Sequence, residues 1–327
     1  MRYASGFCKA ILYICVQILL FMKFLKSVLL SRNSILVFAV IMGLVFGDYS
    51  IYIKDYNIYI LAITMTFAMT GLDLLLIKSF KTVAKPFLMG AVLNYLVFGA
   101  VLLPVAWLLM PSKELFFGFV VIVAAPPGVA IIPFSYFLKG RVEYAIIALT
   151  GAFVASIFVA PLLVNTFARG EGIRPYDLFI TMVQLVLIPL AIAQVLRTKP
   201  LLKYVELVRG KVVDWGFALL IFVAVGMNRQ VFFSDPQVLI LVIATITIAT
   251  FGLGTAYNLV ARKMKLPADL AVTQNMLSTI KSSGFSVVTA LTLFGQEAAI
   301  PSAVLAVMVL LYLIYLSLKS SKTLNKA

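Results

Sequence analysis

The sequence predicts an all-α polytopic membrane protein of about ten transmembrane helices, arranged as two inverted five-helix repeats. Composition is the first reason, because 63% of the 327 residues are hydrophobic and only 12% are charged. Soluble domains are roughly 45–50% apolar and about 25% charged. A bilayer accommodates the excess apolar surface, since lipid takes the place of a protein core. The spacing of the apolar runs and the distribution of positive charge are the other two reasons.

The chain contains apolar runs that are separated by charged residues or by Pro and Gly. Each run has about the 20 residues that a helix needs to cross a hydrocarbon core. They predict ten spans, at 34–52, 57–77, 86–109, 115–138, 143–167, 176–196, 212–229, 237–260, 268–294 and 300–318. The loops are short, so no separate soluble domain is expected. The predicted parts are an N-terminal cytoplasmic or interfacial segment 1–33, a first repeat 34–167, a stretch 168–211 with helix 6 and a basic loop, a second repeat 176–318, and a tail 319–327.

Positive charge is distributed unevenly across these spans. Of the 27 Lys and Arg residues, 21 fall on the side of the two termini and five on the other side, and Lys281 lies inside a span. Membrane proteins collect Lys and Arg on the cytoplasmic side. We therefore expect a multi-pass protein of the cell (inner) membrane with both termini in the cytoplasm. The net charge of +15 then needs no nucleic-acid partner.

The apolar run 10–22 is short and is flanked by Lys9 and Lys23. It is interpreted as an interfacial helix, a short extra span, or an upstream extension of a chain whose translation begins at Met22. A cleaved signal peptide is not expected, because no small-x-small site follows the run.

Missing residue types exclude several kinds of site. The chain has no histidine, which is the commonest acid/base group near neutral pH and the commonest metal ligand. Its two cysteines, Cys8 and Cys15, are interpreted as small hydrophobic residues of an apolar segment. No Ser-His-Asp set, Walker loop, CxxC or HExxH motif occurs. We expect no metal, no cofactor and no enzymatic activity.

Two spans that are five helices apart carry matching breaks. Span 4 contains Pro126, Pro127, Gly128 and Pro133, and proline removes backbone N–H groups from a helix. Span 9 contains a polar cluster before Gly284, which is too costly to face lipid and should face the bundle interior or water. A simple proline kink is the alternative for span 4. Repeats with an odd number of spans are inverted, and matched interruptions in inverted repeats are typical of the binding sites of secondary transporters.

Lys281 is the most unusual residue of the polar cluster. An ionisable side chain inside a span costs roughly 2.5–3.5 kcal/mol on insertion scales. It could release its proton and act as a proton carrier, or stay charged as a fixed cation for an anionic substrate or a carboxylate partner. Snorkelling to the interface is the alternative, but Lys265 lies about 24 Å away along a helix. Asp73 is interpreted as interfacial, and Asn94 and Gln184 as helix-packing polar groups, with Asn94 kept as a candidate ligand.

At the two breaks the sequence resembles the bile acid:sodium symporter family and its wider superfamily, which includes arsenite permeases and, more distantly, auxin efflux carriers. The matching stretches are TGLD (70–73), APPGVAIIPFSYFLKGRVEYAI (125–146), Pro161 and SSGFSVVTALTLFGQEAAIPSAVL (282–305). The resemblance extends over roughly residues 34–318. It implies a panel domain, a core domain in which broken helices 4 and 9 cross at the substrate site, and alternating access.

The departures from this family concern sodium. By the resemblance, Ile131 and Ile132 stand where a Ser-Asn pair binds sodium, and Ala145 and Leu149 replace hydroxyls of span 5. Leu277 and Lys281 replace the Glu and Gln of span 9. Both sodium sites are therefore expected to be absent, with an ammonium where a sodium ligand would be. Arsenite is not expected as a substrate, because the arsenite permeases use a cysteine in span 4.

The function expected is secondary active transport of a small organic solute, with an organic anion favoured, without sodium and with protons as the candidate coupling ion. The alternatives are a sodium-coupled bile-acid-type symporter with displaced ion sites, and a channel or exporter of the same fold. The candidate site residues are Pro127, Gly128, Ile131, Ile132, Lys281, Ser282, Ser283, Gly284 and Asn94. The solute, the direction of transport and the oligomeric state are left open.

Overall fold

The computed structural model describes residues 32–72, 80–168, 176, 179–180, 183–227, 229 and 235–324. All regular elements among these residues are helices, apart from one isolated backbone bridge between Pro127 and Lys281. The predicted all-α fold is confirmed. The run 10–22, Met22 and Asp73 lie outside the described residues.

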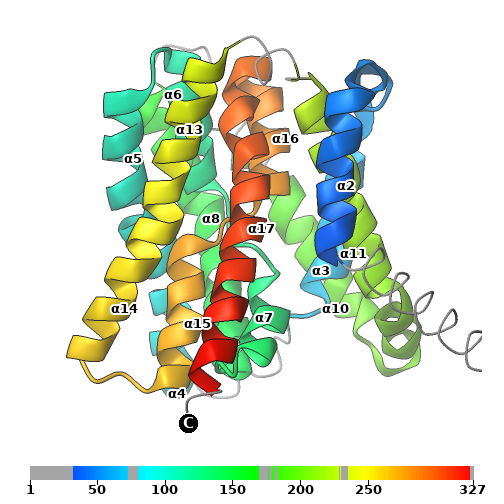
Figure 1. The fold of residues 1–327 in the computed structure, drawn as a ribbon. Coiled ribbons are helices and arrows are strands. Elements are labelled where there is room, and N and C mark those ends of the chain that lie inside the picture. Colours follow the sequence, from blue (N-terminus) through cyan, green and yellow to red (C-terminus); the bar gives the residue numbers. More distant parts are fainter. Residues whose placement is uncertain are drawn as a thin grey trace, which may run out of the picture.

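Helices lie in the range of every predicted span (Figure 1). In chain order they are α2 (Arg32–Val45), α3 (Asn57–Met69), α4 (Phe80–Ala91), η4 (Val92–Val97), α5 (Phe98–Leu109), α6 (Lys113–Ala124), α7 (Ile131–Phe137), α8 (Val142–Phe167), η5 (Val183–Leu187), α10 (Ile188–Leu196), α11 (Lys199–Met227), α13 (Pro236–Thr247), η6 (Ile248–Gly252), α14 (Leu253–Lys263), α15 (Ala268–Thr279), α16 (Ser283–Phe294) and α17 (Gln296–Leu324). The elements η4, η5 and η6 are π-helical turns. The short 3₁₀ elements η1 (Gly47–Tyr52) and η2 (Lys54–Tyr56) connect α2 to α3.

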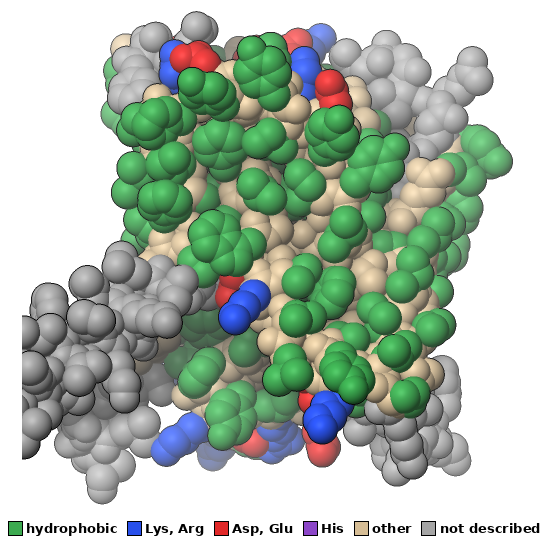
Figure 2. All heavy atoms as spheres, turned by 90° about the vertical axis from the view of Figure 1, so that its right-hand side faces the viewer, with side chains coloured by type: hydrophobic (Ala, Val, Ile, Leu, Met, Phe, Trp, Pro, Cys, Tyr) green, Lys and Arg blue, Asp and Glu red, His purple; other side chains and the backbone are tan. Residues whose placement is uncertain are grey.

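Among the residues that the structure describes, five continuous helical stretches are long and apolar enough to cross a bilayer. They are Val83–Leu109, Val142–Phe167, Pro200–Met227, Pro236–Lys263 and Gln296–Lys319. On the face shown in Figure 2, hydrophobic side chains cover most of the middle, and most of the charged side chains lie near the two ends. Large apolar side chains are exposed on these stretches, among them Trp107, Leu108 and Leu162, as expected of surfaces in contact with lipid. The chain is therefore a polytopic membrane protein, while the number of ten crossings stays a prediction.

The basic loop predicted between spans 6 and 7 is instead mostly helical. Helix α11 begins at Lys199, so that Lys203, Arg209 and Lys211 belong to its first turns. Leu, Lys, Arg and Glu are all good helix formers. Hydropathy marks only the part of a helix that lies in lipid, and it therefore missed this polar extension.

The helices form two groups. Helices α2, α3, α10 and α11 pack on one another and lie on the right in Figure 1. The remaining helices form the larger body, in which α4 packs on α8 and α6 packs on α16 and α17. The groups meet where α11 contacts α16 and α17. This division corresponds to the panel and core domains that the resemblance implies, and these names are used below.

The two broken helices cross inside the core. Helix α6 ends at Ala124 and α7 begins at Ile131, while α15 ends at Thr279 and α16 begins at Ser283. The extended segments between them run antiparallel and pair through their backbones. The N–H of Gly128 donates to the carbonyl of Ile280 (3.2 Å), and the N–H of Ser282 donates to the carbonyl of Pro126 (3.0 Å). The predicted crossing of broken helices 4 and 9 is confirmed.

Candidate functional site

Lys281 lies at the crossing and is buried, with 2% of its surface exposed. Its ammonium nitrogen donates to the side-chain oxygen of Asn94 (2.6 Å), the carbonyl of Val123 (2.9 Å) and the carbonyl of Asn94 (3.4 Å). All three acceptors are buried inside the core, so the side chain does not snorkel to the interface. This arrangement excludes the interfacial alternative for Lys281.

The described groups around the ammonium can stabilise a positive charge, and none of its hydrogen-bond partners neutralises that charge. Val123 is in the last turn of α6, where carbonyls lack intrahelical donors and the helix dipole is negative. The rings of Tyr95 and Phe98 have their centroids 4.6 and 5.5 Å from the nitrogen, within the range of cation–π attraction. Among the described residues, the hydrogen-bond partners of Lys281 are neutral groups, and none is the carboxylate that the sequence allowed. The protonated side chain therefore brings a net positive charge to the crossing.

Asn94 connects the ammonium to the last turn of α15, the half-helix that precedes Lys281. It lies in the π-helical turn η4, which interrupts the regular helix between α4 and α5, and it is fully buried. Its amide nitrogen donates to the carbonyl of Leu277 near the end of α15 (3.4 Å). Asn94 thus packs between helices and also accepts a hydrogen bond from Lys281. Gln184, which was given the same packing interpretation, is exposed in η5.

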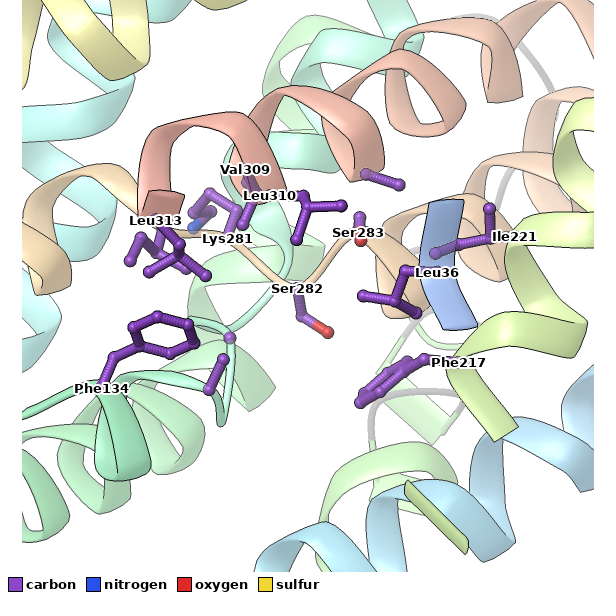
Figure 3. A pocket seen from close by; sticks show the side chains of 14 residues that line it. Leu36, Phe134, Phe217, Ile221, Lys281, Ser282, Ser283, Val309, Leu310 and Leu313 are labelled. Carbon is purple, nitrogen blue, oxygen red and sulfur yellow. The ribbon is translucent and has the colours of Figure 1, made fainter. Parts of the chain in front are cut away.

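A cavity of about 50 Å³ lies where the crossing faces the panel. Figure 3 shows the side chain of Ser282 pointing into the space between Phe134 of the core and Phe217 of the panel. The wall is otherwise mostly apolar, with side chains from α2, α11 and α17, among them Leu36, Ile221, Val309, Leu310 and Leu313. The nitrogen of Lys281 is directed away from this cavity, toward Asn94 and Val123.

The candidate residues other than Asn94 divide into three groups: those at the cavity, Gly284 beside the panel, and a pair in α7. Gly128, Lys281, Ser282 and Ser283 line the cavity, and Pro127 pairs with Lys281 through the backbone bridge. Gly284 allows close packing on the panel, because a Cβ there would lie 2.7 Å from the ring of Phe217.

The third group, Ile131 and Ile132, forms the first turn of α7 and packs in the hydrophobic core away from the cavity lining.

Sequence reasoning missed the apolar half of the site. Phe217 and Ile221 carry no signal that separates them from the other apolar residues of α11. The carbonyl of Val123 could not be predicted either, because the residue type says nothing about which backbone carbonyl accepts a hydrogen bond. Tyr95 and Phe98 lie close to the candidate Asn94 in sequence, and only their packing over the ammonium distinguishes them.

Two interrupted helices that meet at a buried crossing are typical of the class of membrane transporters. The chain matches the Sodium Bile acid symporter family over residues 58–235, which is more than half of its length, and it belongs to this family. The expected family is confirmed. The match includes the first broken helix and ends before Lys281.

A curated relative supports the same class. The chain is 26% identical over 282 residues to the uncharacterized sodium-dependent transporter YocS of Bacillus subtilis (strain 168). The alignment covers 84% of this chain and 85% of the relative.

Proposed function

We propose that the protein is a secondary active transporter of a small organic anion that works by alternating access and without sodium. The observation that carries this proposal is the buried ammonium of Lys281, which is held by the oxygens of Asn94 and Val123. In this proposal the ammonium supplies the positive charge that a bound sodium ion supplies in coupled symporters.

The position of the ammonium supports the substitution. In transporters with broken helices, unwound carbonyls and the C-terminal ends of half-helices coordinate the coupling cation. Lys281 occupies this environment, because it binds the last turn of α6 and, through Asn94, is linked to the last turn of α15. A metal cation bound to the same oxygens would occupy the volume of the ammonium and would be repelled by its charge.

The preference for an anion rests on the other half of the crossing. Helix α16 begins at the cavity, and its first N–H to pair within the helix is that of Ser286. The N–H groups before it lack intrahelical acceptors, and helix N-termini attract anions. Ser282 and Ser283 add hydroxyl groups, and no Asp or Glu is found among the described lining residues. The mostly apolar remainder of the wall fits an amphipathic solute better than a small inorganic ion.

Transport requires the panel to move relative to the core. A cavity of about 50 Å³ has room for a few water molecules and not for an organic solute. Phe217 and Ile221 close it from the panel side, so separation of α11 from the crossing would open it.

We propose protons as the coupling ion, because the amine of Lys281 lies at the crossing and can alternate between charged and neutral forms. The 21:5 distribution of Lys and Arg supports cytoplasmic termini.

The test is flux into proteoliposomes with a panel of radiolabelled organic anions, under imposed sodium or proton gradients. Lys281→Ala and Lys281→Gln are compared with the wild type and with Lys211→Gln, which removes an exposed lysine of α11 outside the site. We expect proton-driven, sodium-insensitive flux that both Lys281 variants lose and the control retains. Normal transport by both Lys281 variants would contradict the proposal.

A sodium-coupled symporter with displaced ion sites is the second candidate, because the relative YocS is named as sodium-dependent. Flux that follows the sodium gradient at constant pH would establish this alternative. A channel or exporter of the same fold is the third. Counterflow, in which solute inside the vesicle accelerates uptake, distinguishes a carrier from a channel.

A further inference from the structure

A larger cavity, of about 420 Å³, lies at the end of the core where the chain reaches its C-terminus. Figure 1 shows α14 and α17 diverging toward this end, with α15 lying between them. Its walls are largely apolar, formed by Leu138, Ala261, Leu266, Ala268, Ala271, Val272 and Leu316. Its polar lining comprises three cationic residues, Lys139, Arg262 and Lys319, together with Asn258, Asn275 and Asp269.

The lining of this cavity carries a net positive charge, because it has three cationic residues and one acidic residue among those described. Asp269 is the one acidic side chain among the described lining residues, and its carboxylate accepts a hydrogen bond from Arg141 Nε at 2.5 Å. The carboxylate of Asp269 is therefore already paired with Arg141, which does not line the cavity. Lys319 lies beside Tyr315, with its nitrogen 5.5 Å from the ring centroid. Arg262 and Lys139 are exposed.

Lys139 has a backbone conformation that is unusual for any residue other than glycine. Its φ of 56° places it in the left-handed region, where it ends α7. The next N–H, that of Gly140, donates to the carbonyl of Ser135 (2.7 Å) and completes the helix-end motif. Glycine adopts this conformation most easily.

Lys265 (φ 53°) ends α14 in the same way, with Leu266 N–H donating to the carbonyl of Ala261 (2.9 Å), yet it does not line the cavity. The chain thus contains a matched pair of lysines, and one member faces the cavity.

We propose that this cavity binds the phosphate headgroup of an anionic membrane lipid. Basic pockets between transmembrane helices on the cytoplasmic side are suited to such headgroups. The cations would contact the phosphate, and the apolar walls would contact the start of the acyl chains. Both flanking helices also carry exposed apolar side chains outside the cavity, including Leu259 on α14 and Leu311 on α17. A soluble phosphate compound would use the cations but not the apolar walls.

The position of α15 gives the lipid an effect on the crossing. This helix begins at Ala268 in the cavity wall and ends at Thr279, two residues before Lys281. Its twelve residues span about 18 Å. A headgroup bound at its start would hold α15 against α14 and α17, and would thereby stabilise the segment that carries Lys281.

The experiment measures binding to the purified full-length chain in a neutral detergent. The probes are dihexanoyl-phosphatidylglycerol, dihexanoyl-phosphatidylcholine, glycerol 3-phosphate and inorganic phosphate. Lys139→Gly and Arg262→Gln test the cavity, and Lys265→Gly is the matched control, because both glycine variants relieve the same backbone conformation. We expect the anionic lipid to bind more tightly than the other three probes. Its affinity should fall as the salt concentration rises. Each cavity variant should lose about fivefold in affinity, and the control less than twofold.

Three outcomes would overturn the proposal. Equal binding of the phosphatidylcholine probe would show that the cations play no part. An equal loss in Lys265→Gly would assign the attraction to the basic surface as a whole. Binding of glycerol 3-phosphate or inorganic phosphate as tightly as the anionic lipid would identify a soluble ligand instead. Since binding is read without flux, these outcomes are independent of the transported solute.

Discussion

The side-chain oxygen of Asn94 lies 2.6 Å from the ammonium nitrogen of Lys281, although 187 residues separate the two in sequence. The amide nitrogen of the same Asn94 donates to Leu277, close to the end of α15. One side chain outside both broken helices therefore joins the ammonium to the last turn of α15, on the near side of the break that carries Lys281. The charge at the crossing depends on this amide being neutral, and this dependence can be tested directly.

The variant Asn94→Asp should weaken anion transport while keeping the fold. A carboxylate in the position of the amide would form an ion pair with Lys281 and cancel the positive charge that is proposed to favour the solute. We expect the concentration for half-maximal flux to rise about tenfold or more, which corresponds to about 1.4 kcal/mol. Asn94→Leu is the companion variant, because it removes the oxygen without adding charge. An unchanged affinity in Asn94→Asp would mean that the solute does not sense Lys281.

Removal of the ammonium should create a site that small cations can fill. Lys281→Ala leaves the oxygens of Asn94 and Val123 without their donor, and each lost hydrogen bond from a charged group costs roughly 1.5–3 kcal/mol. The unfolding temperature should fall by several degrees. Added n-propylammonium should restore part of it, and sodium should stabilise this variant but not the wild type. A variant that responds to neither cation would contradict the view of Lys281 as an ion substitute.

The breaks and the crossing could be predicted from the sequence, because Pro126, Pro127 and the polar run before Gly284 cannot be placed in regular lipid-facing helices. The burial of Lys281 followed from its distance to Lys265. Its partners could not be predicted, since Val123 contributes a backbone carbonyl and Asn94 has a common packing role in other membrane helices.

The panel side of the cavity was also beyond prediction. Phe217 and Leu36 are apolar residues in a chain that is 63% hydrophobic, so their type carries no information. Only the packing of α11 and α2 against the crossing distinguishes them. The helical start of α11 at Lys199 was missed for a different reason, namely that hydropathy reports contact with lipid and not backbone conformation.

Gly128 should tolerate no branched side chain. A Cβ at this position would lie 3.1 Å from Cγ2 of Ile280 and 3.3 Å from the carbonyl oxygen of Lys281, both in the extended segment with which Gly128 pairs. Gly128→Val should therefore separate the two segments and abolish flux, with a lower unfolding temperature. Gly210→Ala is the control, because nothing lies within 4 Å of a Cβ there, and alanine favours helix by about 1 kcal/mol. Normal flux in Gly128→Val would show that the backbone pairing is dispensable.

The hydroxyl groups of Ser282 and Ser283 should affect solute affinity more than the maximal rate. Both residues line the cavity at the start of α16, and Figure 3 shows the Ser282 side chain pointing into it. We expect Ser282→Ala and Ser283→Ala each to raise the half-saturating concentration about threefold to tenfold, as for the loss of one hydrogen bond of 0.5–1.5 kcal/mol. Ser286→Ala is the control, since its hydroxyl donates to the backbone of Ser282 and Ser283 and does not line the cavity. Equal effects in all three variants would mean that the hydroxyls support the helix start and do not contact the solute.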